Sequence, residues 1–180
     1  MADKNNPAVP TDPAGGVVPV IPVRYFSPIR SLCCRGYPGH PRGCPNYGKR
    51  PSCPPQAKPL HEVLDLNQQV WAIYNRFPIG GHAARMKAKH PDWSERQMYC
   101  CLYWQPQARK QLRARIMAWL RDSDIPEGCR RVLTCPEACG CNVTATMAAV
   151  GIQLEWPPRT VAYQVALAGV ARLKEMEDAD

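Results

Sequence analysis

The chain has 180 residues, with 10 cysteines, 20 prolines and a net charge of +8 at pH 7. This length suits a single domain with its own core, and the longest apolar stretches, 16–22 and 161–171, are too short or too interrupted to span a bilayer. The N-terminus also lacks the basic and then apolar segments of a signal peptide. We therefore expect a cytoplasmic protein with no membrane partner, whose positive charge favours RNA, DNA or an acidic protein.

The first 22 residues are rich in Asn, Pro and Gly without any periodicity, which predicts a disordered N-terminal arm followed by a single domain over 23–180. That domain begins with a short extended piece at 23–26. It continues with a loop of Pro, Gly and Cys over 31–59, which lacks the apolar period of a helix. So long a loop needs something other than a hydrophobic core to hold it.

The middle of the chain has the periodicity of helices. Apolar residues recur at steps of three and four over 63–77 and are followed by helix breakers at 78–81, which predicts one helix. Ser94 and Gln97 fit a capping box, so a second helix is expected from about Glu95 to Trp104. Pro106 suits the first turn of a third helix. Its apolar stripe, opposite a basic face, contains Ala108, Leu112, Ile116, Trp119 and Leu120.

The last part of the chain is predicted to alternate strands and helices. Strands are expected at 130–134 and 152–156, and helices at 143–150 and from about 160 to 176. Because parallel strands need a crossover helix, this order indicates a small parallel sheet element. The predicted fold is α+β, or small α/β, helix-dominant, with a parallel sheet element and a long metal-bound cysteine loop.

Ten cysteines in a cytoplasmic chain favour a metal or redox site over a disulfide scaffold, because reducing pools keep thiols unpaired. In the loop, Cys34, Cys44 and Cys53 are separated by nine and eight residues, and proline follows the last two. Zinc ribbons carry tighter C-x2-C pairs, whereas a proline after a ligating cysteine occurs in ferredoxin-type runs. The spacing therefore favours an iron–sulfur cluster over zinc, and we expect a cluster of the 4Fe-4S type.

A second cysteine group surrounds the turn between the predicted strand and helix near residue 135, where a helix N-terminus stabilises thiolates. This group completes the first site or forms another. Cys100 and Cys101 are instead predicted to be small buried helix residues. The candidate metal ligands are Cys34, Cys44, Cys53, Cys135, Cys139 and Cys141, with Cys33, Cys129 and His40 as less certain ones.

Two segments carry a family resemblance. Residues 44–55, CPNYGKRPSCPP, resemble the early signature of a family of uncharacterised microbial proteins described as predicted metal-binding, and residues 146–152, TMAAVGI, resemble its late segment. As in that family, the late segment follows a second cysteine cluster, although the cluster spacing differs here. The resemblance implies a cysteine-bound metal, an iron–sulfur cluster, with no established reaction.

Three functions stay open at this point. A cluster held by only three thiolates leaves one iron open for Lewis-acid or sulfur-transfer chemistry on an acidic or nucleic-acid partner. A redox sensor would lose the order of its loop with the cluster. The third is a zinc-stabilised, non-enzymatic nucleic-acid-binding module. In either nucleic-acid case, the residues expected to contact phosphates are Arg109, Lys110, Arg113 and Arg121.

Overall fold

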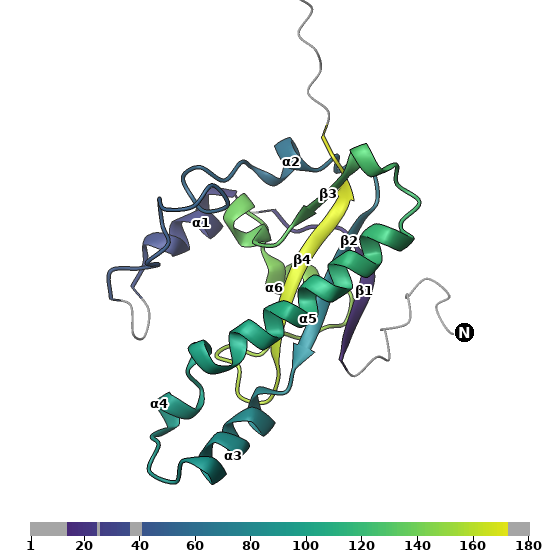
Figure 1. The fold of residues 1–180 in the computed structure, drawn as a ribbon. Coiled ribbons are helices and arrows are strands. Elements are labelled where there is room, and N and C mark those ends of the chain that lie inside the picture. Colours follow the sequence, from purple (N-terminus) through teal and green to yellow (C-terminus); the bar gives the residue numbers. More distant parts are fainter. Residues whose placement is uncertain (1–13, 25, 37–40, 173–180) are drawn as a thin grey trace, which may run out of the picture.

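The computed structural model describes residues 14–24, 26–36 and 41–172. Its centre is an antiparallel sheet of four strands in the order β1-β2-β4-β3 (Figure 1). All three pairings in this sheet are antiparallel, so the predicted parallel sheet element is wrong. The strands are β1 (Gly15–Val20), β2 (Val70–Phe77), β3 (Arg130–Leu133) and β4 (Ala162–Val170).

The prediction of one helix over 63–77 is wrong, because most of this segment forms the central strand β2. Only a short helix, α2 (Leu60–Val63), precedes it. Residues of β2 are apolar on both faces: Ile73 and Phe77 lie on the side of α5 (Cys101–Asp122), and Val70 and Tyr74 on the opposite side. A strand buried on both faces has a continuous apolar run, in which helix-like steps of three and four also occur.

The closing helix predicted from residue 160 is wrong for the same reason. Strand β4 occupies 162–170 and pairs with both β2 and β3. Its Ala166 and Ala168 lie beneath α5, whereas Val165 and Leu167 face the other way. The strand predicted at 152–156 is not formed, so the described residues contain no crossover unit. The strand predicted at 130–134 is confirmed by β3, and the helix predicted at 143–150 is confirmed by α6 (Val143–Ala148).

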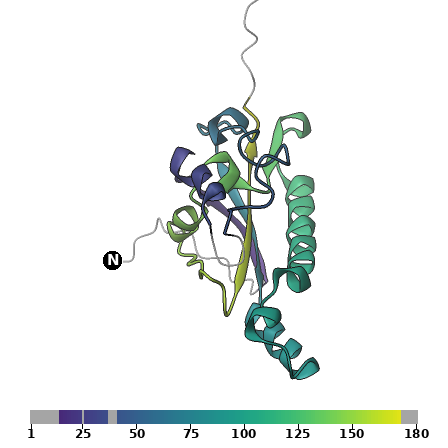
Figure 2. The same ribbon diagram turned by 90° about the vertical axis from the view of Figure 1, so that its left-hand side faces the viewer.

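Helix α5 covers one face of the sheet, and its predicted apolar stripe is confirmed. Ala108, Leu112, Ile116 and Trp119 are buried, and the Trp119 ring lies 5.8 Å from that of Trp71 on β2. Pro106 lies inside the helix rather than in its first turn. Figure 2 shows α5 on one side of the sheet, with α1 and α6 on the other.

The capping box at Ser94 is confirmed, and it opens the short helix α4 (Glu95–Met98). The predicted continuation to residue 104 is wrong, because Cys100 is the N-cap of α5 and Cys101 is its exposed first residue. Helices α3 (Ile79–Lys89) and α4 lie beyond the end of the sheet (Figure 1) and are here called the α3–α4 arm.

The opposite face of the sheet is covered by α6, α2 and the 3-10 turn η3 (Pro136–Cys139). Two further 3-10 turns are η1 (Leu32–Cys34), directly after helix α1 (Phe26–Ser31), and η2 (Glu127–Cys129). Strand β1 forms one edge of the sheet, although its residues belong to the arm predicted to be disordered. Residues 1–13 of that arm lie outside the described residues.

Replacing Ile73 by alanine tests the packing of α5 on the sheet. Ile73 is 0% exposed, so the truncation should lower the free energy of unfolding by about 2–5 kcal/mol. Urea denaturation measures the loss. Ile21→Ala removes the same atoms from a residue that is 88% exposed and should change stability little; equal losses in both variants would contradict this account of the core.

Candidate metal centre

A backbone contact between Cys33 and Cys44 closes the first part of the early cysteine loop. The Cys44 amide donates a hydrogen bond to the Cys33 carbonyl over 2.8 Å. Gly43 makes this approach possible, since its φ is +85° and a Cβ atom there would lie 2.6 Å from the same carbonyl oxygen. Glycine is the residue that accepts both the positive φ and the close backbone contact. The fold therefore places Cys33 and Cys44 side by side.

A second turn brings Cys53 back toward Cys44. The Tyr47 amide donates to the Cys44 carbonyl over 3.1 Å, and the Gly48 amide donates to the Pro54 carbonyl over 2.8 Å. Gln56 also donates through Nε2 to the Gly48 carbonyl. These bonds fold the segment 44–54 into a compact hairpin-like loop. They give several of its backbone N–H and C=O groups hydrogen-bond partners without a strand or a helix.

The thiols of this loop influence one another electrostatically. Burial raises the pKa of Cys33, and the neighbouring thiols of Cys44, Cys53 and Cys34 raise it further, in that order. A hydrogen bond with the Cys34 thiol is the main cause that raises the pKa of Tyr47. Like charges raise a thiol pKa only when they lie near it, so the loop gathers its cysteines in one region.

The late cysteines divide between this region and the core. Burial is the largest effect that raises the pKa of Cys135, and Cys53 of the early loop also raises it. Cys135 therefore links the two groups. Cys139 is buried in the core cluster, and its pKa is raised to about 11 by burial and then by Cys135.

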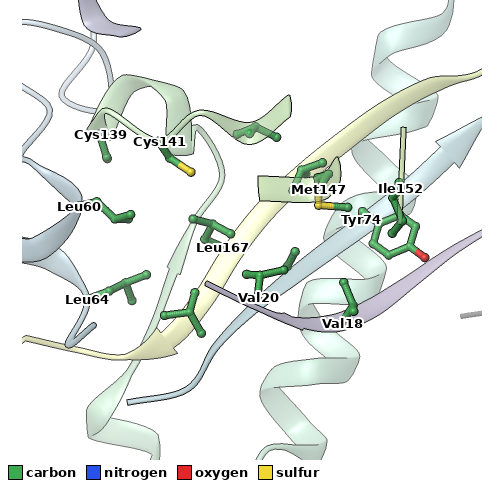
Figure 3. Packing of buried hydrophobic residues seen from close by; sticks show 14 residues of the cluster. Val18, Val20, Leu60, Leu64, Tyr74, Cys139, Cys141, Met147, Ile152 and Leu167 are labelled. Carbon is green, nitrogen blue, oxygen red and sulfur yellow. The ribbon is translucent and has the colours of Figure 1, made fainter. Parts of the chain in front are cut away.

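Cys141 belongs to the core. It is 0% exposed, and its sulfur lies 3.5 Å from the Thr146 hydroxyl oxygen. Figure 3 shows its side chain among the apolar residues of the cluster, beside Leu167. Burial raises its pKa to about 11, against the opposing effect of the Thr146 hydrogen bond. A thiol that is so enclosed and already hydrogen-bonded is structural in this arrangement.

Another predicted ligand, Cys129, lies away from the thiol cluster. Cys129 ends η2, before β3, whereas Cys135 follows that strand, so the strand separates them. The Cys129 carbonyl accepts a hydrogen bond from the Ala171 amide over 2.7 Å. His40 lies outside the described residues.

Charged residues that the sequence analysis did not single out also surround the site. Helix α1 packs against η3, and Arg30 donates to the Pro55 carbonyl over 2.7 Å, which ties α1 to the end of the cysteine loop. The charge of Arg30 lowers the pKa of Cys139. Glu137 is exposed as a residue, yet burial of its carboxyl group raises its pKa. No motif in the sequence connects either residue to the cysteines.

The predicted phosphate-contacting residues Arg109, Lys110, Arg113 and Arg121 are all exposed on α5. Arg109 donates to Gln105 Oε1 over 2.8 Å, and its charge lowers the pKa of Cys135. Arg121 is paired with Asp122 over 2.7 Å. The exposed basic side chains thus follow one another along α5 from Arg109 to Arg121.

The donor set fits a thiophilic metal, because soft thiolates select zinc, copper(I) and iron–sulfur clusters. Neighbouring thiols also raise the pKa of Cys33 and of Cys135, and a cationic centre would relieve that repulsion. Within the described ranges, however, no three His, Cys, Asp or Glu side chains are arranged closely enough to hold a metal ion. The fold gathers thiols in one region without closing them into a ligand shell.

Comparison of the chain with protein-family models, with curated proteins and with solved structures finds no match. The resemblance to a predicted metal-binding family therefore stays a prediction. Among the described residues, no helix has the length and apolar character needed to cross a membrane.

Replacing Gly43 by alanine should open the loop. The new Cβ would clash with the Cys33 carbonyl, and the positive φ of this position would be strained for alanine, so we expect faster hydrogen exchange at the Cys44 amide and reduced stability. Gly48→Ala is the matched control, because Gly48 has a φ of +71° with nothing within 4 Å of a Cβ. That change should cost only the backbone strain, about 1–2 kcal/mol. Equal exchange at Cys44 in both variants would show that the close contact is unimportant.

The buried thiols predict a loss of stability at high pH in the metal-free protein. Burial raises the pKa of Cys139 and Cys141 from 9.0 to about 11. The unfolded chain then releases protons that the folded state keeps, so the free energy of unfolding is unaffected below about pH 9 and falls as pH rises toward 11. Denaturation at pH 7 and pH 10.5 measures this fall. It should be smaller in Cys141→Ala, and an unchanged pH dependence there would contradict the assignment.

Proposed function

We propose that this protein is a metal-centre protein that holds an iron–sulfur cluster, of the 4Fe-4S type, through cysteines of both groups. The observation that carries the proposal is the closed backbone of the early loop, in which the Cys44 amide bonds to the Cys33 carbonyl and the Gly48 amide to the Pro54 carbonyl. Helix α1 connects this loop to η3, which follows Cys135, because α1 packs against η3 and its Arg30 donates to the Pro55 carbonyl. The resemblance of residues 44–55 to a predicted metal-binding family supports the same conclusion.

The proposed ligands are the cysteines that share the thiol region. They exclude Cys141, which is engaged with Thr146 in the core, and Cys129, which lies before β3. Cys139 anchors η3, and Cys135 lies close enough to raise its pKa. The proposed ligands are therefore Cys33, Cys34, Cys44, Cys53 and Cys135, with Cys139 next to them.

A cluster, when bound, supplies one-electron transfer or an open Lewis-acidic iron. The chain's own residues prepare the region for it. Arg109 and Arg30 place positive charge near Cys135 and Cys139, which favours their ionised forms. Tyr47 hydrogen-bonds with the thiol of Cys34. Thiolates of this kind must stay reduced to bind metal, which suits the cytoplasm that we propose as the compartment.

Metal and sulfide analysis of protein purified without oxygen tests the proposal. We expect a brown protein that absorbs near ~400 nm and contains iron and sulfide. Cys44→Ser, Cys53→Ser and Cys135→Ser should each reduce the iron content and the absorbance. Cys101→Ser is the matched control, because Cys101 is exposed on α5, and this variant should load fully.

Two results would contradict the cluster. A colourless protein with stoichiometric zinc would favour the zinc-stabilised module instead. Iron uptake that is unaffected by Cys53→Ser and Cys135→Ser would show that the two groups do not share a centre. If the cluster is confirmed, reversible loss of the absorbance on oxidation, together with faster hydrogen exchange over 41–59, would identify the sensor function.

A further inference from the structure

Three aromatic rings form a continuous stack where the α3–α4 arm meets the start of α5. The rings of His90 and Trp93 are 4.2 Å apart and inclined by 10°, and those of Trp93 and Tyr103 are 5.0 Å apart and inclined by 28°. Lys87 donates through Nζ to the Pro91 carbonyl over 2.6 Å and to the Trp93 carbonyl over 3.3 Å. These bonds stabilise the turn between α3 and α4. The ring stack is therefore preformed in the protein without a ligand.

The stack is not part of the hydrophobic core. The neighbouring residue Trp104 belongs to the core instead: it is buried and stacks on Phe77 with ring centroids 5.5 Å apart. Tyr103, in contrast, is 52% exposed although it stacks on Trp93. An aromatic stack that ends in an exposed ring can be extended by another flat π system.

The exposed face of α5 continues from Tyr103 as a basic surface. Lys110 is seven residues further on, which is about two helical turns and the same side of the helix. Lys110 and Arg113 are exposed, opposite the stripe that packs on the sheet. On the arm, Lys89 and Arg96 are exposed as well. Of the carboxylates on the arm, Glu95 is paired with Arg159 over 2.5 Å, and Asp92 is exposed beside Trp93.

We propose that this surface binds single-stranded nucleic acid, with a base stacked on Tyr103 and the following phosphates on Lys110 and Arg113. Base stacking on an aromatic ring, combined with a basic track for the backbone, is the arrangement that single-strand binders use. A duplex is disfavoured, because its bases are already stacked on each other. An acidic peptide would satisfy the basic side chains but would leave the ring stack without a partner. This site is separate from the proposed metal centre and does not require it.

Fluorescence anisotropy with a labelled oligothymidylate tests the proposal on the full chain, both metal-loaded and metal-free. We expect binding at low salt, and weaker binding of a hairpin duplex of equal length. Tyr103→Leu keeps apolar bulk but removes the ring, and should weaken binding by about five- to 100-fold. Lys110→Gln combined with Arg113→Gln should reduce the slope of log affinity against log salt by about 1–2.

Matched controls separate the site from general effects. Trp156→Leu removes an aromatic ring that is 90% exposed on another loop, and Lys58→Gln removes a charge from the exposed side of the cysteine loop. Both variants should bind as the wild type does. Circular dichroism melts confirm that Tyr103→Leu is folded.

Four results would overturn the proposal. They are no binding at low salt, equal affinity for the duplex, equal losses in Tyr103→Leu and Trp156→Leu, and equally strong displacement by a poly-glutamate of the same charge. Because binding is measured with and without metal, failure of the metal centre would leave this test intact.

Discussion

The whole arrangement depends on the burial of both faces of β2 and β4. These neighbouring strands carry apolar side chains on each side, so the sheet needs a cover on each side. Helix α5 provides one cover. The other is assembled from short pieces, namely α2, α6 and η3, because the remaining chain contains few residues with a sustained helical period.

The difference between the two covers of the sheet, one long helix and a set of short pieces, determines where the late cysteines lie. The irregular cover contains Cys139 and Cys141, whose burial anchors η3 to the sheet. Gly140 follows η3 in the left-handed conformation that ends such a turn. Cys135 is exposed as a residue and directly precedes η3, although partial burial of its thiol raises its pKa. The apolar core thus positions a chemical group that takes no part in the core.

The sequence predicted elements well where one face of a segment is apolar and the other polar. Helix α5 follows such a pattern from Ala108 to Trp119, and the capping box at Ser94 marks a local hydrogen-bond pattern that does not depend on the rest of the chain. The same reasoning failed for β2 and β4. Strands buried on both faces show no alternation of apolar and polar residues. In β4, the alanines at 162, 166 and 168 also have high helix propensity. Only the packing of α5 on the small alanine side chains selects the strand.

The cysteine site shows a similar limit. Spacing and proline context identified the loop thiols, and the backbone bonds around Gly43 and Gly48 show how the loop closes. The difference between Cys135 and Cys141 was not predictable, since it depends on which side of η3 meets the sheet. Neither Arg30 nor Glu137 stands in a motif, because their positions result from the packing of α1 against η3.

The position of Arg109 connects two parts of the surface. Its charge favours the thiolate form of Cys135, while its own helix carries the exposed basic side chains. A polyanion lying along α5 would cancel part of this positive potential, so Cys135 would release its proton less readily. Coupling between two sites acts equally in both directions. Removal of Arg109 would therefore lower the positive charge of the helix and, at the same time, take away one of the effects that favour the Cys135 thiolate.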